Sequence, residues 1–418
     1  MTVLPESRNV FYDESMVSYY GWVVVGMGFL ANLVAFGLVY SFGVFFKPLA
    51  SEFGWSRSVT AGAFGFYGIF HTLLALFAGR VCDRFGPTLV LTIAGFCLGL
   101  SMILMTYITT LWEFYLYFGA LFSIGIAAEF IPVMSTVSQW FKVKRGFAVG
   151  LTAAGLGAGS LVFSPLSAWL ISSFGWRKAY TIIGILSWVV FVPIVKFMKQ
   201  IPRESTGCEE SGGFSLSEAL GTRAFWAFGI SWFFIAITLW AMMIHIVPLA
   251  TDRGMHMLTA GILAGIIGAT SIIGRISAGF FSDKVGRKRV LIIEFTIQLI
   301  ALIWLLFSTN IWMLFFFAVL FGISSGGWAG VIAAFPADYF GFKATGSILG
   351  FAEILAGVGV AIGPYVGGHI FDLTHSYNYM VIMCIMATIA AIISASLLRP
   401  PFKLRLPSKV GERNGISL

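Results

Sequence analysis

Charged side chains are scarce in this chain. Only 11% of its 418 residues are Asp, Glu, Lys or Arg, whereas 58% are hydrophobic and the mean hydropathy is +0.92. Water-soluble domains carry about 25% charged residues, so this composition excludes a soluble globular domain and makes lipid the solvent for most of the surface. The four cysteines are scattered and fit neither a disulfide framework nor a metal site. We therefore expect reduced cysteines, no metal and no cofactor.

Signals of enzymatic chemistry or nucleic-acid binding are missing as well. The net charge of +8 does not indicate nucleic acid, because the cations cluster in short loops between apolar runs. The glycine-rich segments at 155–159 and 357–359 lie in mid-run and lack the Lys-Ser/Thr that completes a phosphate loop. With no triad, metal cluster or cofactor loop, a membrane-embedded enzyme is the weaker class, and we expect that the chain is not an enzyme. Residues 1–19 are polar and mixed in charge, which predicts a short tail and not a cleaved signal peptide.

What the chain does contain is a repeat at a spacing of 200 residues. Gly, Asp, a cation and a second Gly recur at the same offsets in residues 79–88 and 279–288, and each stretch lies between two long apolar runs. A weaker echo matches Pro165 with Pro364 at a spacing of 199. A repeat at about half the chain length predicts a duplicated membrane bundle.

Twelve apolar runs approach or exceed the roughly 20 residues that a membrane span needs. They occupy residues 20–44, 58–78, 88–107, 114–138, 147–172, 180–197, 225–249, 258–278, 290–308, 311–335, 345–370 and 377–398. Turn residues punctuate them, among them Lys47-Pro48, Phe174-Gly-Trp176 and Gly286. The long connection 198–224 is polar and flexible, with a short helix expected at 214–220. The sequence thus predicts an all-α membrane protein with an N-terminal six-helix half (1–197), a linker (198–224) and a C-terminal half with a short tail (225–418).

The positive charges predict the orientation of these spans. If both termini lie in the cytoplasm, 20 of the 26 lysines and arginines fall on the cytoplasmic side, five fall on the opposite side, and Arg275 lies inside a span. Cytoplasmic loops carry the excess of Lys and Arg in membrane proteins. We therefore expect a multi-pass protein of a plasma or bacterial inner membrane with both termini in the cytoplasm.

Twelve spans, a central linker and the two Gly-x-x-x-Asp-Arg/Lys-x-Gly loops resemble the major facilitator superfamily over essentially the whole chain. Within it, the segments 21–25 (GWVVV), 40–49 (YSFGVFFKPL) and 53–57 (FGWSR), with 144–146, 174–177 and 245–248, look like monocarboxylate transporters and their bacterial oxalate/formate relatives. The resemblance implies two pseudo-symmetric halves, alternating access, and a small carboxylate carried with a proton or in exchange.

The chain departs from that family at two positions that bear on coupling. Animal monocarboxylate transporters place an Asp four residues before the helix-8 Arg, and this chain has Ser271 there. The lysine of their first helix aligns with Tyr40, whereas the Arg itself is retained as Arg275. The resemblance therefore implies the anion anchor but not the family's proton-relay pair.

Arg275 is the leading candidate for the substrate site. Ionised side chains at the centre of a span cost about 2.5–3.5 kcal/mol on insertion scales, so they usually face a cavity or a partner. The guanidinium offers a planar fork of donors that matches a carboxylate. The alternatives are a structural ion pair or snorkelling toward the nearby membrane face.

Three further titratable residues lie within spans and are candidates for proton coupling: Glu353, Glu129 and His71. Either acid can carry a proton if burial favours its neutral form, or it can neutralise Arg275 or bind a neighbouring helix. The resemblance implies that spans 2 and 11 meet, so His71 and Glu353 are a possible pair; a packed, hydrogen-bonded His71 is the plainer alternative. Glu294, in a scaffold span, is expected to be structural.

The remaining candidates are lining and gating residues. Six residues are predicted to line the cavity with donors and aromatic walls: Tyr40, Ser271, Asn32, Tyr67, Trp240 and Trp328. For the Trp and Tyr residues among them, packing or the interfacial belt is the alternative. For gating, the resemblance points to Asp83, Arg84, Asp283 and Lys284 of the repeated loops, which otherwise serve topology and turns. His245 gates the outer mouth or is an interfacial histidine.

The sequence as a whole predicts a secondary transporter of small organic anions. Monocarboxylates such as lactate or pyruvate are the expected class, moved by proton symport or anion exchange through alternating access, by a functional monomer. An exporter of hydrophobic compounds and a non-transporting nutrient sensor on the same fold are the alternatives. Flux in liposomes separates transporter from sensor.

Overall fold

The fold is known from a computed structural model of the chain, which describes residues 14–141, 144–199, 213–332, 335–341 and 343–399. Within these ranges the regular elements are all helices. Their bounds are α1 Glu14–Phe53, α2 Arg57–Phe85, α3 Pro87–Met105, α4 Leu111–Phe114, a π-helical turn Tyr115–Leu121, α5 Phe122–Trp140, α6 Arg145–Phe197, α7 Leu216–Leu220, α8 Arg223–Asp252, α9 Met257–Val285, α10 Arg287–Leu306, α11 Ile311–Ile332, α12 Phe335–Phe340, α13 Thr345–Thr374 and α14 Tyr377–Ser396.

The helices of the described part of the chain supply twelve membrane crossings. Eleven helices are long and apolar enough to cross a membrane. The longest of these helices, α6, holds two crossings. Gly175 breaks α6 with φ 78° and ψ 161°, a backbone conformation open to glycine and strained for other residues. The predicted twelve spans and the predicted turn at Phe174-Gly-Trp176 are therefore confirmed, and α7 confirms the expected short helix before span 7.

One predicted turn is wrong. Lys47-Pro48 does not end the first span, because α1 continues through Pro48 to Phe53. Proline removes one backbone donor from a helix, but in membrane helices neighbouring packing compensates for the lost bond. Here the extension packs Leu49 completely out of solvent, so tertiary burial outweighs the local preference of proline.

The two repeated loops adopt the same turn. Gly86 ends α2 with φ 80° and ψ 160°, and Gly286 ends α9 with φ 91° and ψ 142°. Each glycine donates its N–H to a carbonyl four residues earlier, on Cys82 and Ser282 respectively. The 200-residue sequence repeat is thus also a repeat in backbone geometry.

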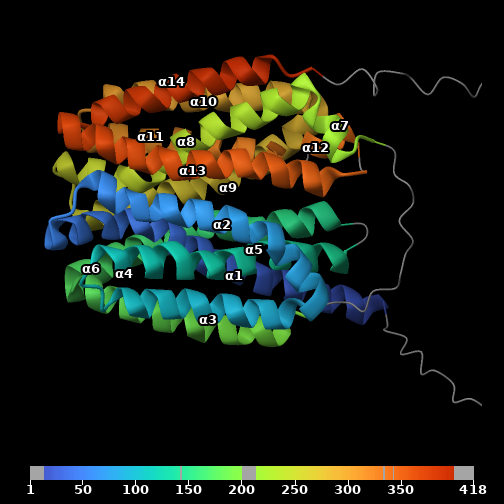
Figure 1. Ribbon diagram of the computed structural model, residues 1–418, viewed down its shortest axis with the longest axis horizontal. Coiled ribbons are helices and arrows are strands. Elements are labelled where there is room, and N and C mark those ends of the chain that lie inside the picture. Colours follow the sequence, from blue (N-terminus) through green and yellow to red (C-terminus); the bar gives the residue numbers. More distant parts are fainter. Residues whose placement is uncertain (1–13, 142–143, 200–212, 333–334, 342, 400–418) are drawn as a thin grey trace, which may run out of the picture.

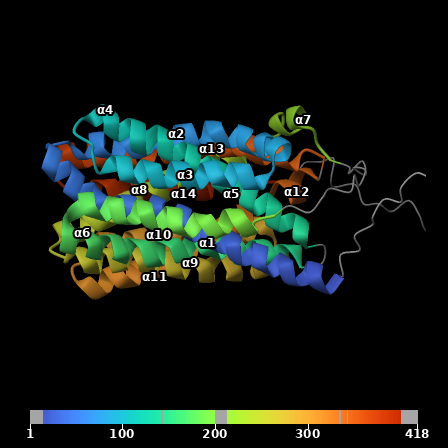
Figure 2. The same ribbon diagram turned by 90° about the horizontal axis from the view of Figure 1, so that it is seen from below.

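Most helices run side by side along one direction, as Figures 1 and 2 show. At one end of the bundle α2 turns into α3 and α9 into α10 (right in Figure 1, beside α7 and α12), and we call it the basic end. We call the opposite end the latch end, after the ion pairs described in the next section. Helices α1–α6 and α8–α14 form two six-crossing halves, which meet where α2 packs on α13 and α6 packs on α9. At Gly157 of α6 a side chain would lie only 2.4 Å from the carbonyl oxygen of Gly268 in α9, so this interface depends on small residues.

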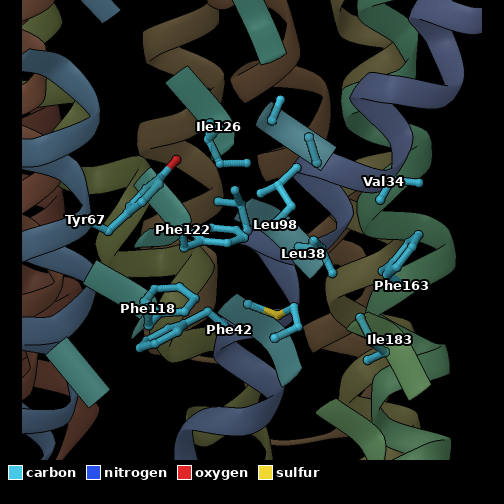
Figure 3. Close-up of a cluster of buried hydrophobic side chains, with 14 of the residues drawn as sticks. Val34, Leu38, Phe42, Tyr67, Leu98, Phe118, Phe122, Ile126, Phe163 and Ile183 are labelled. Carbon is cyan, nitrogen blue, oxygen red and sulfur yellow. The ribbon is translucent and has the colours of Figure 1, made fainter. Parts of the chain in front are cut away.

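The N-terminal half has an aromatic core of its own. Phe42, Phe118 and Phe122 are essentially unexposed and pack with aliphatic residues of α3 and α6 (Figure 3). Phe42 and Phe118 lie 4.5 Å apart between ring centroids, and Tyr67 lies at one side of this cluster. The core fixes α1, α2 and α5 against one another, which positions the side chains that face the other half.

Candidate functional site

Arg275 lies on α9 where the two halves meet. Its Nη1 donates to the backbone carbonyl of Ala153 on α6 at 2.8 Å, which is a bond across the halves. The side chain is half-buried. Among the described residues no carboxylate lies within ion-pair distance of it. A guanidinium carries five N–H donors, so this geometry leaves donors for a further acceptor.

Tyr40 and Tyr67 lie near Arg275 and the membrane acids. Tyr40 of α1 interacts with Arg275, and its ring stacks on Trp240 of α8 at 5.9 Å between centroids. Tyr67 of α2 lies near Tyr40, Glu353 and Glu129. Five side chains, from α9, α1, α2, α13 and α5, thus form what we call the central cluster: Arg275, Tyr40, Tyr67, Glu353 and Glu129.

The acids of this cluster differ in their surroundings. Glu129 is completely unexposed, and neither carboxyl oxygen has a hydrogen-bond partner within the described part of the chain. Glu353 is half-buried and has no hydrogen bond or ion pair with any other described residue. The five residues come from both halves, and Arg275 is a cation without an acidic partner among the described residues.

His71 does not pair with Glu353 in this structure. Its ring lies 5.6 Å from that of Tyr67, with an interplanar angle of 27°. Thr72 of α2 faces Gly357 of α13, so the expected meeting of spans 2 and 11 is present even though the ion pair is not. A role of His71 in proton coupling stays a prediction.

Three of the predicted lining residues are engaged within the helix packing. The amide of Asn32 donates to the carbonyls of Gly28 and Thr152, and Ser271 donates to Gly268 at 2.7 Å. Trp328 is 4% exposed, in a hydrophobic cluster of the C-terminal half, and its indole N–H has no described partner. Their contact with substrate stays a prediction, whereas Tyr40 and Tyr67 lie in the central cluster.

A second polar site closes the latch end. Asp252 at the end of α8 accepts from Lys47 of α1 at 2.6 Å and from Arg57 of α2 at 2.7 Å. Asp372 of α13 accepts the backbone N–H groups of Arg57 and Ser58 at 2.9 and 2.8 Å. We call these residues, together with Tyr377, the latch. Every ion pair that joins the halves within the described ranges belongs to it.

His245 is part of the same network. The Nε2 atom lies 2.9 Å from the carbonyl oxygen of Pro364, which can only accept, so Nε2 carries the proton. The Nδ1 atom of His245 then accepts a hydrogen bond from the hydroxyl group of Tyr377, 3.2 Å away. The same hydroxyl oxygen accepts a hydrogen bond from Arg57. The predicted position of His245 at a mouth between the halves fits this geometry; a gating action stays a prediction.

Sequence reasoning missed the latch because its partners are far apart in the chain. Arg57 and Asp372 are separated by 315 positions, and Lys47 and Asp252 by 205. The available signal was that Lys47 and Arg57 lie at span ends on the same side as the acids Asp252 and Asp372. Only the packing of the halves determines which of them pair.

The second repeated loop carries ion pairs that stay within one half. Asp283 pairs with Arg287 at 2.7 Å, and Arg287 also donates to Asp338 of α12 at 2.8 Å, all within the C-terminal half. Lys284 lies over the ring of Phe280, and Arg84 over that of Phe85. The side chain of Asp83 lies outside the described residues, so its gating role stays a prediction.

Comparisons with known proteins show which family this chain resembles. The family model described as Major Facilitator Superfamily matches residues 28–284 and 249–417. The chain is 28% identical over 386 residues to the "Uncharacterized MFS-type transporter YcxA" of Bacillus subtilis (strain 168), covering 87% of this chain and 92% of that protein. It is also 28% identical over 382 residues to monocarboxylate transporter 4 of Rattus norvegicus, covering 87% and 80% of the two chains.

A solved structure shows the same fold. The bacterial homolog to the human lysosomal transporter Spinster, in an inward-facing and unoccupied conformation, superposes with a TM-score of 0.72 at 15% identity, over 90% of this chain and 97% of that chain. Both the relatives and the fold are of the transporter type and not enzymes. The chain therefore belongs to the Major Facilitator Superfamily, as a multi-pass membrane transporter with a sequence like those of monocarboxylate transporters.

Proposed function

We propose that this protein transports small organic anions, with monocarboxylates such as lactate or pyruvate as the class, and that Arg275 binds the carboxylate. The observation that carries the proposal is the free guanidinium: Arg275 bonds one backbone carbonyl across the halves and has no acidic partner among the described residues. A carboxylate satisfies both its charge and its remaining donors in a bidentate geometry. The names of the relatives, among them monocarboxylate transporters 4 and 13, support the same class.

The surroundings of Arg275 suit a small anion. Tyr40 supplies a hydroxyl near the guanidinium, and its stacking on Trp240 orders an aromatic wall contributed by both halves. Because α1 and α2 belong to one half and α8 and α9 to the other, a bound anion would touch both halves. This is the arrangement that lets a substrate bias the rocking of two halves around one site.

Coupling proceeds through protons or by exchange. Ser271 occupies the place of the family's helix-8 acid, so a proton carrier has to lie elsewhere. Glu353 and Glu129 lie near Tyr67 in the central cluster. Neither carboxyl oxygen of Glu129 has a hydrogen-bond partner in the described part of the chain, and Glu353 forms no ion pair there. Protonation of one of them would offset the charge of an anion that enters with it, which supports symport with Glu353 as carrier and Glu129 as second candidate.

The same proposal assigns a side to each end. With both termini in the cytoplasm, the basic end faces the cytoplasm and the latch closes the outer mouth, which makes this structure inward-facing. The halves then correspond to residues 1–197 and 225–418, joined by the linker 198–224, and the transporter works as a monomer in a plasma or bacterial inner membrane.

A counterflow screen tests the function directly. Proteoliposomes loaded with one unlabelled carboxylate are challenged with trace amounts of labelled lactate, pyruvate, formate or oxalate. We expect accumulation of a labelled monocarboxylate against its gradient, driven only by the unlabelled substrate inside. Accumulation of hydrophobic amphiphiles but of no carboxylate would instead indicate an exporter. The absence of flux despite substrate-induced stabilisation would indicate a sensor.

A further inference from the structure

A cavity of about 630 Å³ lies away from the central cluster, at the basic end of the C-terminal half. It is formed by the start of α8, the end of α7 and the end of α14, which lie at the upper right edge of the bundle in Figure 1. Its lining is Leu220, Gly221, Thr222, Arg223, Ala224, Trp226, Ala227, Ile230, Ser394, Ser396, Leu397 and Arg399. None of the central-cluster or latch residues belongs to it.

The cavity has a cationic mouth. Arg223 at the first position of α8 and Arg399 just after α14 are both exposed. Neither has an acidic partner among the described residues, and the lining contains no Asp or Glu. Both arginines lie beside the N-terminus of the 30-residue helix α8, where the helix dipole adds further positive potential. The mouth therefore attracts an anion, because no acidic side chain of the lining neutralises its two arginines.

Below the mouth the wall is apolar and faces lipid. Ile230, one turn beyond Trp226 on α8, is 41% exposed, and Leu397 at the end of α14 is 66% exposed. Trp226 is 44% exposed, and its Nε1 donates to the carbonyl of Leu220 at 2.9 Å. A tryptophan held in this way, polar edge toward the helix end and ring toward the hydrocarbon, is typical of the membrane–water interface.

The geometry of the cavity is fixed by bonds between its walls. Ser394 of α14 donates to the carbonyl of Ala227 on α8 at 2.9 Å, which holds the two helices together. Lys288 of α10 donates to the carbonyls of Ser396 and Leu398 at 2.6 and 2.9 Å. These bonds occupy the ammonium of Lys288 and hold the end of α14, and with it Arg399, opposite Arg223.

We propose that this cavity binds an anionic glycerophospholipid, with its phosphate between Arg223 and Arg399 and an acyl chain along Trp226, Ile230 and Leu397. A cationic pocket at a helix end, continuous with a lipid-facing apolar wall, matches both parts of such a molecule. A free phosphate ion would use only the mouth and leave the apolar wall without a role. The site is independent of the proposed substrate site, because the two share no residue.

The experiment measures lipid retention and its location. Native mass spectrometry of the purified full-length protein is run with phosphatidylglycerol or phosphatidylcholine of identical acyl chains, and with inorganic phosphate alone. Phosphatidylglycerol should bind, phosphatidylcholine should bind much more weakly, and inorganic phosphate should not displace the lipid. A photoactivatable phosphatidylglycerol in nanodiscs should label peptides that contain residues 220–230 and 394–399. This labelling is read on the wild type and so needs no variant to fold.

Substitutions then test whether Arg223 and Arg399 bind the lipid phosphate. Each of Arg223→Gln and Arg399→Gln should weaken phosphatidylglycerol binding about fivefold, and the double variant about thirtyfold. Arg289→Gln is the matched control, because Arg289 is an exposed arginine at the same end of the bundle and outside the cavity. Labelling confined to other helices, or equal retention by the double variant and the wild type, would overturn the proposal. Equal binding of inorganic phosphate would reduce the site to one for a free anion and overturn the lipid assignment.

Discussion

Arg57 and Asp252 join the two halves of the transporter at one end, with Arg57 Nη2 and Asp252 Oδ2 2.7 Å apart. Both side chains are mostly shielded from solvent, with 17% and 25% of their surfaces exposed. Asp252 also receives Lys47, and Arg57 also donates to Tyr377. Removing one partner leaves the other charge partly buried and unpaired, which costs more than the loss of a fully exposed pair. This relationship makes the latch the point where the halves are held electrostatically.

The first prediction is that Asp252→Asn opens the latch end. Loss of the carboxylate charge leaves Lys47 and Arg57 beside each other without their shared counter-charge. A destabilisation of about 1 kcal/mol, the upper range for partly exposed pairs, shifts the conformational balance about fivefold. The measurement is the rate at which a water-soluble thiol reagent modifies Phe46→Cys, a buried position beside His245, in a variant without the native cysteines.

Glu52→Gln provides the control for this experiment. Glu52 pairs with Arg177 at the same end of the bundle, but both residues belong to the N-terminal half. Its loss should leave the modification rate at position 46 unchanged. If Asp252→Asn and Glu52→Gln raise the rate equally, the effect reflects general loosening of that end, and the latch does not control opening.

The second prediction concerns the anchor. Arg275→Gln should weaken carboxylate binding at least tenfold, since a hydrogen bond to a charged group contributes about 1.5–3 kcal/mol. Arg275→Lys should also be impaired, because an ammonium cannot reproduce the planar fork. The readout is the rise in melting temperature on addition of substrate, which should vanish while the melting temperature without substrate stays similar. Near-normal affinity in the Gln variant would remove Arg275 as the anchor.

The third prediction tests the duplicated turn. Gly286→Ala forces a side chain into a backbone with φ 91°, which costs about 1–2 kcal/mol for an L-residue. Gly279→Ala is the matched control, since a Cβ there meets nothing within 4 Å and the backbone is helical; it should be neutral or slightly stabilising. Thermal unfolding in detergent measures both. If the melting temperature of the Gly286→Ala protein equals or exceeds that of the wild type, the turn accommodates the side chain without strain.

Much of the fold follows from patterns that the sequence displays locally. Runs of apolar residues predicted the crossings, and the glycines at 175 and 286 predicted where helices end, because the backbone there has positive φ. The prediction at Pro48 was wrong since local preference cannot register the packing that holds α1 together up to Phe53.

The candidate site was less predictable, because depth in the membrane does not reveal which face of a helix a residue occupies. Asn32 and Ser271 were expected to line a cavity; both donate to backbone carbonyls within the helix packing, and their contact with substrate stays a prediction. Arg275 was predicted as the anchor from its charge inside a span together with the family resemblance, and this role stays a prediction. The latch needed the three-dimensional arrangement, because its pairs connect residues from opposite halves of the chain.

The last prediction is that uptake is coupled to protons through Glu353. Because Ser271 occupies the place of the family's acid on span 8, the carrier has to lie elsewhere. Glu353 is a half-buried acid on α13 near Tyr67, with no ion pair among the described residues. Glu353→Gln should flatten the dependence of flux on an imposed pH gradient, because the amide cannot take up a proton. It should spare exchange of substrate for substrate, since exchange does not require the empty carrier to return deprotonated.

The decisive measurement for this prediction is pyranine fluorescence inside proteoliposomes during uptake. The wild type should acidify the lumen in proportion to the substrate taken up, and Glu353→Gln should not. Glu129→Gln serves as the comparison, because Glu129 on α5 is completely unexposed and also has no hydrogen-bond partner within the described part of the chain. Acidification by Glu353→Gln at the wild-type ratio of protons to substrate, together with its loss in Glu129→Gln, would move the role to Glu129. If the wild type itself moves no protons, anion exchange becomes the mechanism, and both acids would then act only on the charge balance around Arg275.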